Sequence, residues 1–143
     1  MNFFTKVILA SVGVLLLAAA VVILFRSREG ARVEALLREA AAWAERGETK
    51  RLEALIDEDF EGGADRARGQ IHLHVRPGAF EKIEITRLDV GVNGDESRVR
   101  VDMRILSRDL GMSYPESLLL TLRRREGGWK ISDAKRPEPA IRR

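Results

Sequence analysis

The two histidines of the chain, His72 and His74, are the residues whose type and spacing come nearest to a metal site. On a β-strand their side chains would share one face, and two imidazoles could begin a zinc site. On an α-helix they would point about 200° apart, and the pair would be lost. Because no third ligand stands at a recognisable spacing, the sequence predicts no metal and no other cofactor.

An acid–base centre would need a carboxylate that faces the protein interior. Residues 98–105 alternate strictly between charged and apolar, so Asp102 is expected on the face opposite to that of Met103. Asp59 and Tyr114 are the remaining candidates. A charge at a helix end and a tyrosine in a loop are the simpler interpretations of these two residues, so we assign no catalytic residue.

A run of three arginines, residues 123–125, raises the question of an anionic partner. Residues 26–122 carry 16 basic and 19 acidic side chains, whereas residues 123–143 carry eight and three. The chain lacks the basic stripe with interleaved aromatic residues that nucleic-acid binders show, so no nucleic-acid partner is expected. The run is interpreted as a solvated strand end. Attraction to anionic lipid is the alternative, provided that a membrane lies within reach.

Residues 7–25, from Val7 to Phe25, contain no charge and no proline and are predicted to cross a membrane as a helix. A span needs about 20 apolar residues, and within lipid a helix satisfies every backbone group. A cleaved signal peptide, cut near Ala20, is the alternative, although the apolar run exceeds the usual signal core of about 7–15 residues. We therefore expect a single-pass protein of the cell membrane that contacts lipid through residues 7–25. Arginines after the segment favour a cytoplasmic domain, whereas short anchors commonly send the following domain outside, and the side stays open.

The rest of the chain is predicted to be one α+β domain, residues 29–136, between an anchor with short flanks (1–28) and a basic flexible tail (137–143). Helical spacing of apolar residues predicts a helix that ends at Gly47 and a short helix after Thr49. Alternation predicts antiparallel strands over residues 83–92 with a bulge near 86–87, over 98–106, over 118–122 and over 129–134. A tight turn at Asn93-Gly94 and a loop over 107–115 are expected between them.

Residues 65–76 fit two structures. Ile71, Leu73 and Val75 alternate with polar residues, which slightly favours a strand. Asp65 as an N-cap, with Ala67 and Ile71 on one face, fits a helix instead.

Residues 42–60, AWAERGETKRLEALIDEDF, resemble the opening of nuclear-transport-factor-2-like (cystatin-like) domains. Residues 127–131, GGWKI, resemble the last strand of that family. The resemblance covers about residues 33–134. It implies a curved, mainly antiparallel sheet that wraps three helices around a cone-shaped pocket, with the third helix at residues 65–76. The family includes isomerases, dehydratases and partner-binding modules, so the resemblance alone assigns no activity.

Six residues are predicted to line the pocket or its mouth: Trp43, Asp59, Phe60, Met103, Tyr114 and Trp129. The sequence predicts a membrane-anchored, non-catalytic binding or assembly domain. It would hold a small apolar ligand in the cone, or a protein partner, such as a second copy, on the open sheet face. The alternative is a small-molecule isomerase, dehydratase or hydrolase that uses the same pocket. A carboxylate beside a tyrosine inside the cone would favour the enzyme.

Overall fold

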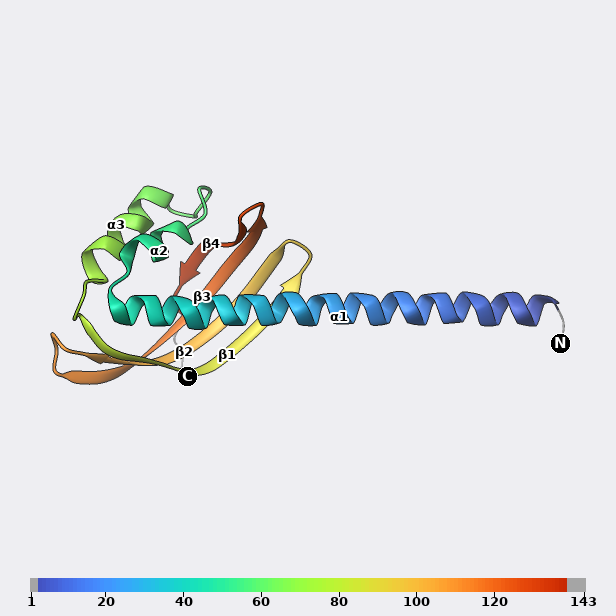
Figure 1. The fold of residues 1–143 in the computed structure, drawn as a ribbon, viewed down its shortest axis with the longest axis horizontal. Helices are drawn as coiled ribbons and strands as arrows, with labels where there is room; N and C mark the ends of the chain where they lie inside the picture. Colours follow the sequence, from blue (N-terminus) through green and yellow to red (C-terminus); the bar gives the residue numbers. More distant parts are fainter. Residues whose placement is uncertain (1–2, 139–143) are drawn as a thin grey trace.

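The computed structural model describes the backbone of residues 3–138 and the side chains of residues 13–21 and 28–138. Three helices precede four strands: α1 (Phe3–Arg46), α2 (Thr49–Ala54), α3 (Ala64–His74), β1 (Phe80–Asn93), β2 (Glu96–Ser107), β3 (Met112–Arg125) and β4 (Gly128–Lys135). The strands form one antiparallel sheet in the order β1-β2-β3-β4. Figure 1 shows the end of α1, together with α2 and α3, on one face of the curved sheet. The predicted α+β architecture is confirmed.

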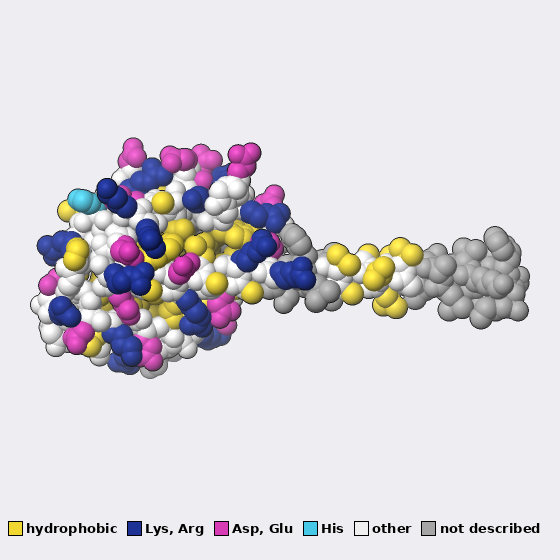
Figure 2. All heavy atoms as spheres, in the orientation of Figure 1, with side chains coloured by type: hydrophobic (Ala, Val, Ile, Leu, Met, Phe, Trp, Pro, Cys, Tyr) yellow, Lys and Arg dark blue, Asp and Glu magenta, His cyan; other side chains and the backbone are white. Residues whose placement is uncertain are grey.

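Helix α1 is continuous over 44 residues, so the predicted first helix of the domain and the apolar segment before it form a single rod. Its N-terminal part projects away from the domain (Figure 1), and the side chains described along it are mostly hydrophobic (Figure 2). Within the described residues, no helix is both long and apolar enough to cross a membrane. The predicted span, residues 7–25, lies partly outside the described side chains, and its insertion into a membrane stays a prediction.

The core lies between the end of α1 and the inner face of the sheet. Val33 and Leu37, one helical turn apart, are buried on α1 and pack in one cluster with Val99, Val101 and Leu122. Strict alternation on β2 explains this arrangement, because a period of two sends all the valines of the strand to the same face. The predicted inner face of this strand is confirmed.

Two features of the predicted hairpin are also confirmed. Asn93 pairs with Glu96 across the turn, and Gly94 has the positive φ of +60° that such a turn requires. The register of β1 against β2 shifts between Ile85 and Arg87. This bulge lets the apolar residues before and after it face the helices.

The ambiguous segment is helix α3, so the strand alternative is wrong and the helix implied by the family resemblance is confirmed. The alternation that favoured a strand has a different origin. His72, Leu73 and His74 are all exposed, which a half-buried strand would not allow. Ala67 and Ile71, spaced as i and i+4, instead turn one helical face toward the interior.

The expected loop over residues 107–115 is shorter than predicted, because β3 already begins at Met112. Pro115 is tolerated inside this strand because β4 pairs only with residues 119–125 of β3. The first half of β3 is therefore a sheet edge, where a missing N–H costs little. The longer strand places Glu116 opposite Met103, on the inner face of the sheet.

Candidate functional site

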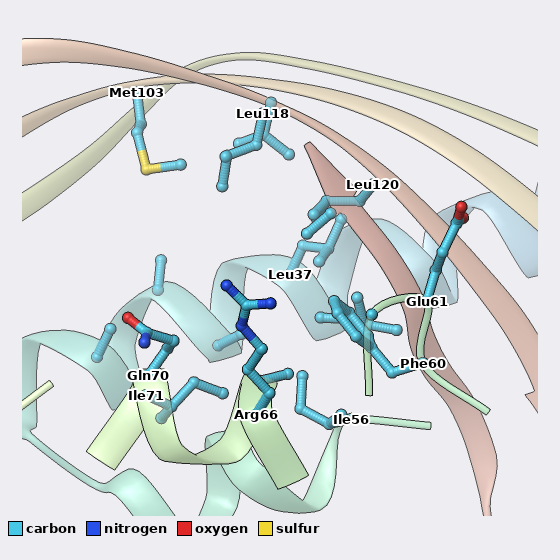
Figure 3. Close-up of a pocket in the computed structure, with 18 of the residues that line it drawn as sticks. Leu37, Ile56, Phe60, Glu61, Arg66, Gln70, Ile71, Met103, Leu118 and Leu120 are labelled. Atoms are coloured by element: carbon cyan, nitrogen blue, oxygen red, sulfur yellow. The ribbon is translucent and has the colours of Figure 1, made fainter. Parts of the chain in front are cut away.

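A cavity of about 550 Å³ lies between the helices and the inner face of the sheet. Its walls come from α1, α3, all four strands and the segment between α2 and α3. The volume falls within the range of about 300–1,000 Å³ that is typical of small-molecule pockets. Met103, Leu118 and Leu120 extend from the sheet into the cavity (Figure 3).

The cavity exists because the helices present small residues where the strands present large ones. Ala40, Ala41 and Ala44 line it from α1, and Ala67 lines it from α3. Apart from Ala134, the strand residues on the opposite wall are Ile, Val, Leu or Met. Larger aliphatic residues at the alanine positions would fill the space, so this pairing of small and large residues leaves an apolar hollow. The lining of the cone is therefore mainly aliphatic.

Three polar side chains, Glu61, Arg66 and Gln70, complete the lining. Arg66 and Gln70 are four residues apart on α3 and therefore share a side of the helix. Figure 3 shows the Arg66 side chain extending from α3 toward the sheet residues, with Gln70 beside it. The Oε1 atom of Gln70 lies 3.1 Å from Nε2 of His74. Arg66 makes no hydrogen bond or ion pair with any residue in the described part of the chain.

The wall segment between α2 and α3 is fixed to β4 by backbone hydrogen bonds. The Asp57 N–H donates to the Ile131 carbonyl (2.9 Å), and the Ile131 N–H donates to the Leu55 carbonyl (2.7 Å). The buried Asp57 carboxylate also accepts a hydrogen bond from Nη2 of Arg125 at 2.9 Å. This bond holds the pKa of Asp57 below its usual value. These contacts position Phe60 on the cavity wall.

Of the six predicted pocket residues, Phe60 and Met103 line the cavity, and the other four lie elsewhere. Trp129 is buried in the core, where its Nε1 donates to Oε2 of Glu29 at 2.9 Å. Trp43 lies near the end of α1, with the guanidinium of Arg51 5.7 Å from its ring centroid.

The remaining candidates also lie away from the cavity. Asp59 is exposed and contacts Nη2 of Arg125 at 3.3 Å. Tyr114 is half-buried on β3 opposite Ile105. Asp102 faces outward, as expected, where the Ser117 hydroxyl and Arg100 lower its pKa.

Sequence reasoning missed four polar residues that line the cavity or face it: Glu61, Arg66, Gln70 and Glu116. Glu116 shares a strand face with Leu118, so the period of two that placed the leucines inside could have located it. Its carboxylate pairs with Nε of Arg136 at 3.1 Å. Arg66 and Gln70 could have been found from their spacing only after residues 64–74 had been assigned as a helix.

The two histidines lie on α3 and do not form a pair. Nδ1 of His72 lies 3.9 Å from Oε1 of Glu53, whereas His74 contacts Gln70. Across the residues that the structure describes, no group of three or more side chains of metal-binding type is placed to hold an ion.

Comparison with known proteins finds similarity in structure alone. No protein-family model matches the sequence, and no curated protein is significantly similar to it. An NTF2-like protein of unknown function from Pseudomonas putida KT2440 superposes with a TM-score of 0.66 at 13% identity, over 79% of this chain and 88% of that one. An NTF2-like protein with a cystatin-like fold from Novosphingobium aromaticivorans gives 0.59 at 20% identity, over 82% and 84%.

A candidate dehydratase of the NTF2-like family from Streptomyces avermitilis gives a TM-score of 0.60 at 19% identity, over 76% of this chain and 95% of that one. Similarity at this level of identity establishes the fold and not the activity. The chain therefore has the cone-shaped fold of NTF2-like, cystatin-like proteins.

Proposed function

We propose that this protein is a membrane-anchored, non-catalytic binding domain that holds a small apolar ligand in its cone. The observation that carries the proposal is the cavity of about 550 Å³, with a lining that is apolar apart from three polar side chains. Burial of apolar ligand surface would supply the affinity. The anchor in this proposal is the predicted span over residues 7–25.

The chemistry of the lining supports binding over catalysis. The lining carboxylate is Glu61, and the described residues of the lining include no histidine, tyrosine or lysine that could act with it as an acid–base pair. General acid–base catalysis needs such a group within hydrogen-bonding reach of the reacting atom. An aliphatic wall can bind and orient a molecule but cannot move a proton.

The binding proposal is tested by titrating the full-length protein with N-phenyl-1-naphthylamine, an uncharged dye that fluoresces in apolar sites. Ala41→Phe places a ring inside the cavity, whereas Ala35→Phe places the same ring on an exposed position of the same helix. We expect Ala41→Phe to weaken dye binding by about tenfold and Ala35→Phe to leave it unchanged. Equal binding by both variants, or no binding by the wild type, would contradict the proposal.

A protein partner on the open sheet face is the other form of this proposal. The outer face of the sheet carries a hollow bordered by charged residues, among them Asp89, Arg98, Arg100 and Lys135. A partner or a second copy would therefore be recognised there by polar contacts rather than by an apolar patch.

The enzyme alternative rests on Glu116, an inward-facing acid next to Tyr114 in the strand alternation. Its carboxylate is engaged by Arg136, and neither Glu116 nor Tyr114 lines the cavity. If the protein were an isomerase, dehydratase or hydrolase, Glu116→Gln would abolish turnover while leaving dye binding intact.

A further inference from the structure

We propose that the ligand is an amphipathic carboxylate, with an apolar chain inside the cone and its single negative charge at Arg66. This inference rests on the proposed function, because it names the class of molecule that the cavity would hold. It follows from Arg66, the one cationic side chain among the described residues that line an otherwise mainly apolar cavity.

Two arginines on α3 have different roles. Arg68 is a structural residue, since its Nη2 lies 2.6 Å from Oε1 of Glu58 and also donates to the Ile56 carbonyl at 3.3 Å. Arg66 makes no such contact with the described residues, and Figure 3 shows it reaching into the cavity. Its guanidinium therefore has its N–H donors available at the place where a ligand would lie.

The number of donors favours a carboxylate. A guanidinium can donate two parallel hydrogen bonds to the two oxygens of a carboxylate. Among the described residues, Arg66 is the only lysine or arginine in the lining. Gln70 can add one donor, because its Oε1 faces His74 and its amide nitrogen is left for the ligand. A phosphate dianion would need a second cation, which the lining does not supply.

Two acidic residues near the cavity do not oppose this assignment. In Figure 3 the Glu61 side chain extends away from Arg66, and Glu61 also borders the hollow on the outer face. The Glu116 carboxylate on the inner face is paired with Arg136. The remaining lining residues are uncharged, so the cavity combines an apolar interior with one positive group.

The test compares decanoate with decanol, which have the same chain and differ in headgroup charge. Binding to the full-length protein in amphipol would be measured by calorimetry for the wild type, Arg66→Gln and Arg104→Gln. Arg104 is an exposed arginine on β2 outside the cavity, so its variant is matched in charge. Comparing the variants with each ligand cancels the partition of that ligand into the amphipol.

We expect Arg66→Gln to weaken decanoate binding by about tenfold, the lower end of the effect of a hydrogen bond to a charged group. Decanol should bind both proteins within about twofold, and Arg104→Gln should change neither ligand. Octanoate should bind up to about fifteenfold more weakly than decanoate, because it lacks two methylene groups and each buried methylene raises the affinity about fourfold. In the wild type, raising the ionic strength to about 0.5 M should weaken the binding of decanoate and leave the binding of decanol unchanged.

Unchanged decanoate affinity in Arg66→Gln, with no effect of salt on the wild type, would overturn the carboxylate assignment and leave the apolar cavity intact. Dye binding without binding of decanoate would overturn it in the same way. If neither the dye nor decanoate nor decanol binds, the proposed function itself is contradicted. Thermal unfolding of Arg66→Gln shows whether the variant is folded. If it is not folded, the effect of ionic strength on decanoate binding to the wild type tests the carboxylate assignment.

Discussion

Glu29 and Trp129 connect the two layers of the fold through one buried hydrogen bond. The indole N–H of Trp129 donates to Glu29 at 2.9 Å, and Nη1 of Arg32 lies 3.1 Å from the other oxygen of the carboxylate. Glu29 is 4% exposed and Trp129 7%. Because β4 and α1 meet at this point, the bond helps to set the direction in which α1 leaves the domain.

Truncation of Trp129 should separate its packing from its hydrogen bond. Trp129→Ala is expected to lower the free energy of unfolding by about 3–5 kcal/mol, as large core truncations do. Trp129→Phe keeps most of the bulk but leaves Glu29 without one donor, at a cost of about 1–3 kcal/mol. Urea unfolding followed by circular dichroism measures both changes. A Phe variant as stable as the wild type would show that the hydrogen bond contributes nothing.

The pairing of Asp57 with Arg125 makes stability depend on acidity. The Arg125 hydrogen bond lowers the pKa of Asp57 in the folded state, so the unfolded state binds the proton more tightly. The pair therefore contributes stability above the unfolded pKa of about 3.9, and this contribution is lost as the pH falls through the lower folded value.

Asp57→Asn should flatten the loss of stability between about pH 5 and pH 2, where this carboxylate titrates. Asp59→Asn is the control, because Asp59 contacts the same guanidinium from an exposed position. Urea unfolding at several pH values gives the two slopes. If Asp57→Asn and Asp59→Asn had the same pH dependence as the wild type, the pair would have no role in acid sensitivity.

At the scale of elements, the corner between α1 and α2 depends on Gly47. Gly47 has a φ of +69°, and a Cβ atom there would clash with the backbone nitrogen of Pro77. Gly111 has a similar φ of +64°, but nothing lies within 4 Å of its Cβ position. The two glycines therefore share a left-handed backbone that would strain an alanine. They differ in their contact with a neighbouring segment.

Gly111→Ala should lower the free energy of unfolding by about 1–2 kcal/mol, the penalty for an alanine in the left-handed conformation. Gly47→Ala should lower the free energy of unfolding by about 1–3 kcal/mol more, because the backbones around Gly47 and Pro77 must move apart. Thermal unfolding of the two variants compares them directly. Equal losses would mean that the approach of Pro77 to Gly47 is easily relaxed.

The elements that local chemistry determines could be predicted from the sequence. The Asn93-Gly94 turn and the bulge after Ile85 follow from turn residues and from a change of parity. Helix α3 could not be predicted from alternation, because exposed His72 and His74 imitate a strand pattern while burial is decided by Ala67 and Ile71. The start of β3 was missed because Pro115 indicates a loop unless the edge position of the strand is known.

The site was predictable in character and not in detail. The period of two on β2 predicted an aliphatic wall that includes Met103, and this wall lines the cavity. Its polar residues were missed, because they become neighbours only through tertiary packing. Arg66 reaches the cavity from α3, far in sequence from Leu118 and Leu120 on the opposite wall.

At the scale of the whole molecule, α1 joins the proposed anchor to the domain without a break. Glu29, the first buried residue of the described side chains, follows the predicted span by four residues, or about 6 Å of helix. If residues 7–25 lie in a membrane, the domain is held close to its surface. The arginine run of β3 lies on that side, since Nη1 of Arg124 is 3.9 Å from Glu29.

The full-length protein should stay with the membrane fraction after washing with high salt and with alkaline carbonate, as an inserted helix does. Immunoblotting of the washed fractions measures this retention. An intact chain released into the wash would contradict the anchor, and a released product that begins near Val21 would show a cleaved signal instead.

The central claim, that a small amphipathic molecule binds inside the cone, is tested most directly by NMR of methionine methyl groups. Met103 lines the cavity, whereas Met112 is 55% exposed at the start of β3, outside it. Titrating the full-length protein, labelled with ¹³C at its methionine methyl groups, with decanoate should shift the Met103 signal in a saturable manner and leave Met112 in place. The Met103 shift should vanish in Ala41→Phe. A Met103 signal that stays fixed in the wild type while decanoate is in excess would contradict the account.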